Sequence, residues 1–176
     1  MVASAIKEKS STIEEYQSLP EGAKYQLIEG NITEMPSPLK LHQKLSFKLT
    51  LLLGNFIEEN DLGEFYTAPF DVYLGEKNVY QPDLLFVSAN RVDIVERRGV
   101  MGAPDLVIEL LSESTESIDR KKKFRNYQKY GVKEYFIIDP EDNEVLSYYL
   151  EDGRYKAAYI SYNTLESRLL GKVFEW

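Results

Sequence analysis

A chain of 176 residues, 43% hydrophobic and 28% charged, is long enough to form one globular domain with a buried core. Its net charge of −8 disfavours tight non-specific binding to nucleic acid, and the absence of cysteine excludes disulfides, thiolate metal ligands and a cysteine nucleophile. No apolar stretch reaches the roughly 18 residues that a membrane-spanning helix needs, so we expect a cytoplasmic protein without a membrane partner.

The first part of the chain predicts a tail, two short elements and a long helix. Residues 1–10 are expected to form a mobile N-terminal tail ahead of a single domain, residues 11–176. Capping and acidic residues at 11–16 predict a short helix. A Gly-Asn pair at 30–31, between two apolar runs, is typical of a β-hairpin. Leucines then recur at helical spacing over residues 39–60, which predicts a long helix.

Strands dominate the middle of the chain, and a helix, a strand and a hairpin follow them. Segments rich in β-branched and aromatic residues predict strands at 65–74, 79–87 and 105–111. A helix is predicted from Ser112–Thr115, where serine and threonine offer an N-cap, to Gly131. The remaining predicted elements are a strand at 134–139 and a hairpin made of 145–150 and 155–160. The order helix, three strands, helix, strand, with hairpins added at both ends, predicts an α/β domain around a mixed β-sheet.

Glu109 is the most informative residue, because it stands in an otherwise apolar run that is typical of a buried strand. An ionised carboxylate removed from water costs several kcal/mol unless a cation or strong donors meet it. One explanation is structural, an acid at the end of a strand paired with arginine or lysine. Asp83 favours a second explanation, because it opens another strand in the same kind of setting. Two carboxylates on neighbouring strands suggest a divalent metal ion between them.

A lysine is the third residue that such a site requires. A metal-dependent phosphodiesterase of this plan uses lysine to hold the attacking water or to neutralise phosphate charge. The expected position, two residues after Glu109, holds a leucine. At 100° per residue, however, Lys123 lies about 40° from Tyr127, on an aromatic face of the following helix that is aimed at the body of the protein. Arg120 shares this arc and is the competing candidate.

Residues 120–125 form the one basic cluster that stands out in this acidic chain. Any phosphate substrate is therefore expected to meet this cluster, or metal ions. Two structural alternatives stay open. The cluster is a solvated basic face, as most charge runs are, or Lys123 forms an i,i+4 ion pair with Asp119.

The residues discussed so far belong to a pattern that resembles a known family. It is a large bacterial family of inferred endonucleases within the PD-(D/E)xK, or restriction-endonuclease-like, superfamily. The resemblance covers most of residues 12–150, and each motif alone is weak while their order is specific. The matching motifs are Tyr25–Gly30, His42, Gln81–Leu84, Gly102–Ser112, Ser114–Thr115, Asp119, Lys123, Tyr127, Gly131–Tyr135 and Asp139–Pro140.

The resemblance implies a restriction-endonuclease-like core with a metal-dependent nuclease site. Asp83 and Glu109 match its metal ligands, and Lys123 matches a catalytic lysine that has moved from strand to helix. Glu29 matches an acidic position near the site and is a further candidate ligand; the alternative is an exposed acid in the hairpin turn. The implied cofactor is Mg²⁺, with Mn²⁺ as a substitute.

The substrate follows from the resemblance and not from the charge of the chain. DNA is the expected partner, and His42, Arg120 and Tyr127 are candidates to bind it. His42 is the only histidine, and its alternative role is that of an ordinary packed or solvent-facing helix residue. On base rates alone we expect a homodimer.

We therefore predict an Mg²⁺-dependent endodeoxyribonuclease. Two alternatives stay open. One is a structure-selective resolvase that acts on branched DNA, and the other is a non-catalytic protein-interaction module that keeps the nuclease fold.

Overall fold

The structure is a computed structural model that describes residues 10–20, 22–112 and 115–176. The predicted N-terminal tail lies outside these residues except for Ser10. Glu113 and Ser114, within the predicted helix cap, also lie outside them. The described residues form an α/β arrangement with a central mixed sheet, as the sequence predicts.

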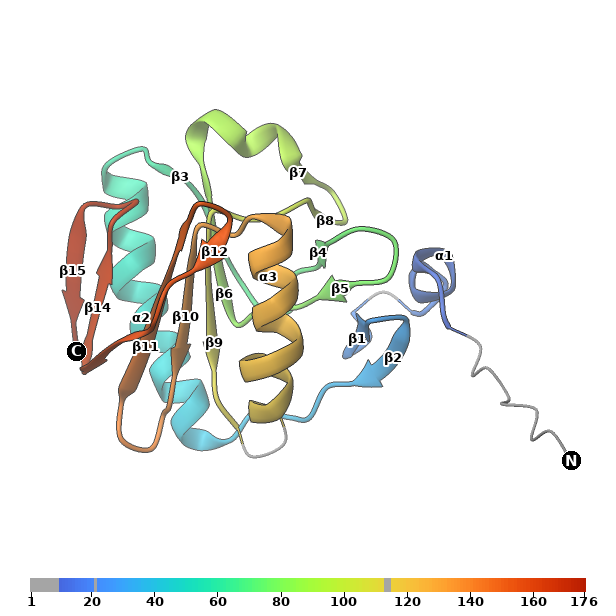
Figure 1. The fold of residues 1–176 in the computed structure, drawn as a ribbon, viewed down its shortest axis with the longest axis horizontal. Helices are drawn as coiled ribbons and strands as arrows, with labels where there is room; N and C mark the ends of the chain where they lie inside the picture. Colours follow the sequence, from blue (N-terminus) through green and yellow to red (C-terminus); the bar gives the residue numbers. More distant parts are fainter. Residues whose placement is uncertain (1–9, 21, 113–114) are drawn as a thin grey trace, which may run out of the picture.

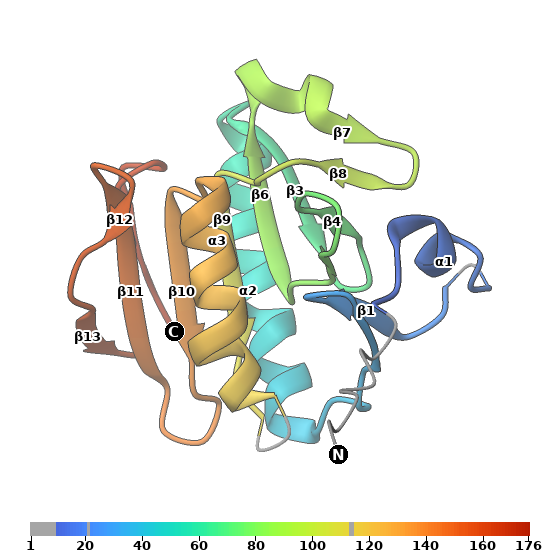
Figure 2. The same ribbon diagram turned by 45° about the vertical axis from the view of Figure 1, so that its right-hand side comes forward.

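The central sheet runs in the order β12-β11-β10-β9-β6-β3, with β13 paired to β11 (Figures 1 and 2). Only β9 and β10 are parallel to each other among the pairs of this sheet that the structure describes, so the sheet is mixed. The strands are β3 (Gly63–Thr67), β6 (Leu84–Ser88), β9 (Leu106–Leu110), β10 (Glu134–Ile138), β11 (Glu144–Glu151), β12 (Arg154–Tyr155) and β13 (Tyr159–Tyr162).

One helix covers each face of this sheet (Figures 1 and 2). Helix α2 (Lys40–Glu59) buries leucines and an isoleucine at every fourth position, from Leu45 to Ile57, against one face. Helix α3 (Phe124–Tyr130) packs Tyr127 against the other face. Because side chains alternate along a strand, β9 sends Leu106 and Ile108 to α2 and Val107 to the α3 side. The acid at position 109 therefore belongs to the α3 face.

A second sheet packs beside the first and carries the N-terminal hairpin. Its order is β2-β1-β5-β4-β8-β7. The strands are β1 (Tyr25–Ile28), β2 (Asn31–Glu34), β4 (Val72–Tyr73), β5 (Val79–Tyr80), β7 (Val95–Glu96) and β8 (Gly99–Met101). Helix α1 (Ile13–Gln17) lies against β1, and the 3-10 helix η1 (Ala89–Ile94) links β6 to β7.

Three sequence predictions need correction. The strands predicted at 65–74 and 79–87 are each divided between the two sheets, and Pro69 and Pro82 lie at the breaks. Proline lacks the N–H that a continuous ladder needs, which accounts for the breaks. The helix predicted up to Gly131 consists of a π-helical segment, η2 (Ile118–Lys123), followed by α3. A further hairpin, β14 (Thr164–Ser167) with β15 (Lys172–Glu175), was not predicted.

A buried acid, Asp105, holds elements of the core together. The carboxylate of Asp105 is fully buried and accepts a hydrogen bond from the Ser88 amide at 2.9 Å. It also lies 2.7 Å from both the Arg91 guanidinium and the Lys133 ammonium. Burial opposes its charge, but the Lys133 and Ser88 contacts hold the pKa of Asp105 at about 2. Asp105 thus joins the start of β9 to η1 and to the loop before β10.

Replacing Asp105 with alanine should lower the free energy of unfolding by about 3 kcal/mol, because hydrogen bonds to a charged group are lost and the Ser88 amide loses its acceptor. Urea denaturation measures the change. The exposed Asp93, in η1, is the matched control: Asp93→Ala should change stability by less than about 0.5 kcal/mol. Equal effects of the two variants would contradict the role given to Asp105.

Candidate active site

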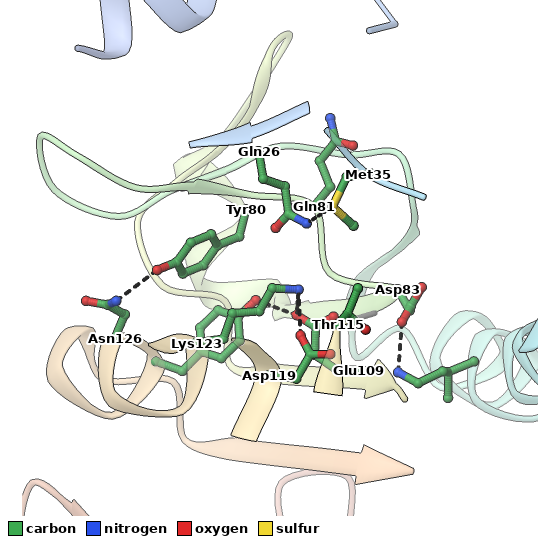
Figure 3. Close-up of polar contacts among 12 residues, drawn as sticks. Gln26, Met35, Tyr80, Gln81, Asp83, Glu109, Thr115, Asp119, Lys123 and Asn126 are labelled. Atoms are coloured by element: carbon green, nitrogen blue, oxygen red, sulfur yellow. Dashed lines mark hydrogen bonds and ion pairs between the residues drawn. The ribbon is translucent and has the colours of Figure 1, made fainter. Parts of the chain in front are cut away.

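Glu109 is buried on β9, in the middle of the central sheet, with 3% of its surface exposed. Its Oε1 accepts a hydrogen bond from the Tyr127 hydroxyl at 2.8 Å and lies 2.9 Å from the Lys123 Nζ (Figure 3). Both contacts come from the helical segment that covers this face of the sheet. The fold therefore brings one hydroxyl and one ammonium to the acid that the apolar run of β9 buries.

Asp83 lies beside Glu109 because of the register between β6 and β9. Leu84 pairs with Ile108 in that antiparallel ladder, so one step further along it brings residue 83 opposite residue 109. The Asp83 Oδ2 accepts a hydrogen bond from the Leu110 amide at 2.8 Å (Figure 3). Its Oδ1 lies 3.2 Å from the Nε2 of His42 on α2. The two predicted ligand residues thus come from adjacent strands and meet at one place.

Lys123 points into the protein, as its helical phase predicts, and is 2% exposed. Its Nζ lies 3.0 Å from the Oδ1 of Asp119 in addition to its contact with Glu109. Asp119 is as buried as the lysine, and its Oδ1 has no hydrogen-bond partner in the described residues. The predicted i,i+4 ion pair is therefore present, but it lies within the cluster of acids and not on the surface.

Asp119 is the residue of this cluster that the sequence did not identify as part of a site. The sequence contains one signal that points to it, the Asp-x-x-x-Lys spacing next to the inward-facing lysine. A surface ion pair explains that spacing equally well, so only the burial of both side chains decides between the two explanations.

The cluster contains more negative than positive groups. Burial raises the pKa of Glu109 to about 8; Lys123 opposes the shift, while the charges of Asp119 and Asp83 add to it. Burial opposes the charge of Lys123, yet Asp119 and Glu109 raise its pKa above the usual value. The raised pKa of Glu109 and the raised pKa of Lys123 are compatible. Near neutral pH the charged lysine pairs with Asp119, and Glu109 keeps its proton.

His42 adds a second group to the Asp83 side of the cluster. Burial disfavours its charged form, but the hydrogen bond with Asp83 and the charges of Asp83 and Asp119 raise the pKa of His42. Its Nδ1 is buried without a hydrogen-bond partner in the described residues. The imidazole therefore positions the Asp83 carboxylate, and it gains positive charge as the pH falls.

A divalent metal ion fits the chemistry of these donors. Mg²⁺ is held by hard oxygen ligands, commonly one or two carboxylates completed by water and substrate phosphate. Asp83 and Glu109 supply such carboxylates. The Oδ1 of Asp119, which is paired with the Lys123 ammonium but has no hydrogen-bond partner in the described residues, is a further buried oxygen beside them. Among the described residues no group of three or more His, Cys, Asp or Glu side chains forms a ready-made ligand set. The fit is thus to an ion that keeps water or substrate ligands.

The cluster opens into a cavity of about 710 Å³. Asp83, Glu109, Asp119 and Lys123 form one wall of it, and His42 and other residues of α2 form another. Its volume is in the range of ordinary ligand sites, about 300–1,000 Å³. The acids and the lysine are therefore accessible to a ligand from one side.

The other predicted site residues lie outside this cavity. Tyr127 is fully buried behind Glu109 and orients it, so its place is that of a positioning residue. Arg120 is one-third exposed and pairs with Glu116 at 2.8 Å. Glu29 lies in the hairpin turn, 41% exposed, and contacts the cations of Lys122 and Arg125. Within the described residues no hydrogen bond or ion pair joins Glu29 to the cluster.

The mixed sheet between two helices is the arrangement of the restriction-endonuclease-like fold. The model of the Uma2 family, described as "Putative restriction endonuclease", matches residues 13–175. The chain belongs to this family, which confirms the family resemblance seen in the sequence.

A solved structure supports the same fold. It is a crystal structure described as "a putative nuclease belonging to DUF820", from Anabaena variabilis ATCC 29413. The two structures superpose with a TM-score of 0.76 over 91% of this chain and 90% of that chain. Their sequences are 19% identical, so the similarity is one of fold.

Two similar proteins carry no established function. An uncharacterized protein of Synechocystis sp. is 27% identical over 135 residues, which cover 74% of this chain and 76% of that protein. An uncharacterized ATP-binding protein of Methanocaldococcus jannaschii is 31% identical over 138 residues, which cover 75% of this chain and 54% of that protein. This chain thus spans about half the length of the second relative.

The described part of the chain contains no helix that is long and apolar enough to cross a membrane.

The raised pKa of Glu109 predicts a pH-dependent stability in the metal-free protein. The unfolded chain loses this proton near pH 4.5 and the folded protein only near pH 8, so the stabilisation is complete below about pH 4.5 and is lost as the pH rises to 8. The slope contributed by one proton is at most about 1.4 kcal/mol per pH unit. Glu109→Gln has no proton to lose and should remove this part of the slope.

Urea unfolding in EDTA at pH 5, 6.5 and 8 measures this dependence. The exposed Glu76→Gln is the control and should keep the wild-type slope. The same slope in wild type and Glu109→Gln would show that Glu109 is ionised throughout the range and that the cluster does not hold the proton.

Proposed function

We propose that this protein is a metal-dependent endonuclease that hydrolyses phosphodiester bonds of DNA. The observation that carries the proposal is the buried Lys123 between the carboxylates of Glu109 and Asp119, beside Asp83, on the wall of an open cavity. Membership of a family described as "Putative restriction endonuclease" supports it.

Asp83 and Glu109 are the residues proposed to hold the metal. A bound Mg²⁺ or Mn²⁺ ion would polarise the scissile phosphate and lower the pKa of a bound water. Asp83 is suited to this role because the Leu110 amide fixes one carboxylate oxygen at 2.8 Å. Tyr127 fixes Glu109 in the same way through Oε1. The two acids are thus oriented before a substrate arrives.

Lys123 is the proposed catalytic cation. Its ammonium stays charged because Asp119 and Glu109 raise its pKa. A positive charge fixed in a desolvated wall stabilises the charge that develops on the phosphate oxygens and holds the attacking water in line. Asp119, 3.0 Å away, positions the ammonium, because a lysine side chain without such a partner has many rotamers.

Cleavage of supercoiled plasmid in Mg²⁺ or Mn²⁺ tests the proposal. Asp83→Ala and Lys123→Met should each reduce the nicking rate at least about 100-fold, because a preorganised charge is lost from the transition state. Lys122→Ala is the matched control, since that neighbouring lysine is 42% exposed and does not line the cavity. A melting temperature close to that of wild type shows that each variant is folded.

Linear DNA and a four-way junction serve as further substrates and separate the alternatives. Cleavage of the junction alone would identify a structure-selective resolvase. Absence of cleavage of any substrate would favour an interaction module that keeps the fold. Sedimentation velocity on the same preparation tests the predicted homodimer.

Metal binding has its own readout, independent of activity. Mg²⁺ or Mn²⁺ at about 100 times its dissociation constant should raise the melting temperature by about 5–10 °C, because the ion binds only the folded protein. Glu109→Gln and Asp83→Asn should abolish this gain, while the exposed Asp93→Asn should keep it. An equal gain in all of these variants would place the ion at another site.

A further inference from the structure

The sequence suggests the basic run at 120–125 as the place that binds phosphate. In the structure most of its cations are paired with acidic side chains. Besides the buried pairs of Lys123, three of its cations form ion pairs in the described structure. These are Arg120–Glu116 at 2.8 Å, Lys122–Glu29 at 3.7 Å and Arg125–Glu29 at 3.4 Å. A cation already paired with a carboxylate contributes little to an additional anion, so a phosphate backbone must be met elsewhere.

Helix α2 offers an unpaired row of cations next to the cavity. Lys40, Lys44 and Lys48 are exposed and follow one another at i, i+4 and i+8, so they share one side of the helix. Their Cα atoms are spaced by about 6 Å along the helix axis. In the described part of the chain none of them forms an ion pair, and residues 35–57 contain no acidic residue at all.

An exposed aromatic side chain lies beside this row. Phe47 is 66% exposed and Leu51, one turn further on, is 46% exposed. At 100° per residue both lie within about 60° of Lys44 around the helix. Phe47 also lines the catalytic cavity, together with Ser46 and Thr50 of the same helix. We call the surface formed by Lys40, Lys44, Phe47, Lys48 and Leu51 the α2 lysine face.

The α2 lysine face continues into the wall of the cavity that holds the acids. His42, one turn from Ser46 on the inner side of α2, lies 3.2 Å from Asp83. The outer side of the same helix carries the three lysines. One rigid element therefore connects the cations with the acidic cluster, and a polymer bound along its surface enters the cavity without crossing an acidic surface of α2.

We propose that the α2 lysine face binds a single-stranded segment of nucleic acid and directs it into the catalytic cavity. The lysines neutralise backbone phosphates, and Phe47 stacks on an unpaired base. The proposal rests on the proposed nuclease function of the cavity. A single strand is favoured over a duplex because a stacking side chain needs the open face of a base, which a duplex keeps within its own stack.

Fluorescence anisotropy with a 20-residue oligothymidylate, in EDTA so that no hydrolysis occurs, tests this binding. The triple variant Lys40→Ala/Lys44→Ala/Lys48→Ala should bind at least tenfold more weakly at 50 mM salt. The slope of log affinity against log salt should fall by about 2, since each phosphate contact in a single strand contributes about 0.7. Phe47→Ala should weaken binding about 5- to 100-fold with little change in this slope.

The matched control is Arg154→Ala/Lys156→Ala/Lys172→Ala, which removes the same charge from exposed positions on β12, β15 and the loop after β12. It should bind nearly as wild type. An equal loss in both triple variants would mean that net charge and not the α2 lysine face matters. With a duplex of equal length, the triple lysine variant should lose more affinity than Phe47→Ala does. If Phe47→Ala weakened binding of the duplex and of the oligothymidylate equally, the single-strand assignment would be overturned.

Three other outcomes separate the proposed role of the α2 lysine face from the alternatives. If Phe47→Ala leaves oligonucleotide binding unchanged and instead dissociates a dimer in sedimentation velocity, the face is an interface between copies of this chain and the proposal fails. Loss of binding in the lysine variant, together with an inactive cavity in the plasmid assay, overturns only the nuclease function. Normal nicking by all the α2 variants, with unchanged binding, overturns only the α2 lysine face.

Discussion

The burial of the Glu109 carboxyl group is the constraint on which the rest of the site depends. Strand β9 is held between β6 and β10, so this group is 3% exposed and must find its partners within the fold. The covering helical segment supplies Tyr127 and Lys123, and Lys123 in turn buries Asp119. Each contact brings another ionisable group out of water, and the result is three carboxyl groups beside one ammonium. Burial and the neighbouring acids keep the proton on Glu109 near neutral pH, and a divalent cation would allow Glu109 to ionise, which gives metal binding a physical reason.

The other buried acids of the core show that burial alone does not create this situation. Asp105 meets two cations and a backbone amide, and Glu134 accepts hydrogen bonds from the Ser167 hydroxyl and from two backbone amides. Both are compensated by donors with no second carboxylate in contact. Among the buried acids that the structure describes, only those of the cluster at Glu109 share a cation and line a cavity. A buried acid with a structural role is therefore distinguished from one suited to a catalytic site by its neighbours and not by its exposed fraction.

The sequence predicted the parts of this site that local rules determine. The apolar run around Glu109 predicted its burial, and the helical phase predicted that Lys123 points inward, because period and polarity act within one element. Contacts between residues far apart in the chain could not be predicted from the sequence. The partner of each cation in the run 120–125 depends on where the turn with Glu29 and the side chain of Glu116 lie in the fold. The divided strands at Pro69 and Pro82 likewise depend on a second sheet that is available to receive β4 and β5. The position of Asp119 in the cluster also depends on how η2 packs against the sheet.

Net charge is a chain-wide value and does not describe how charge is distributed over one face of the molecule. A charge of −8 argues against binding a polyanion only if the acids are spread evenly over the surface. Exposed charges are screened beyond about 8–10 Å at ordinary salt, so a strand on one helix responds to that helix and its surroundings. Residues 35–57 carry three lysines and no acid, and they border the cavity. The acidic residues elsewhere repel the same polymer. In the proposed function, segregated charge of this kind would guide a strand to one side of the molecule, where the acids of the cavity would act on it together with a bound cation.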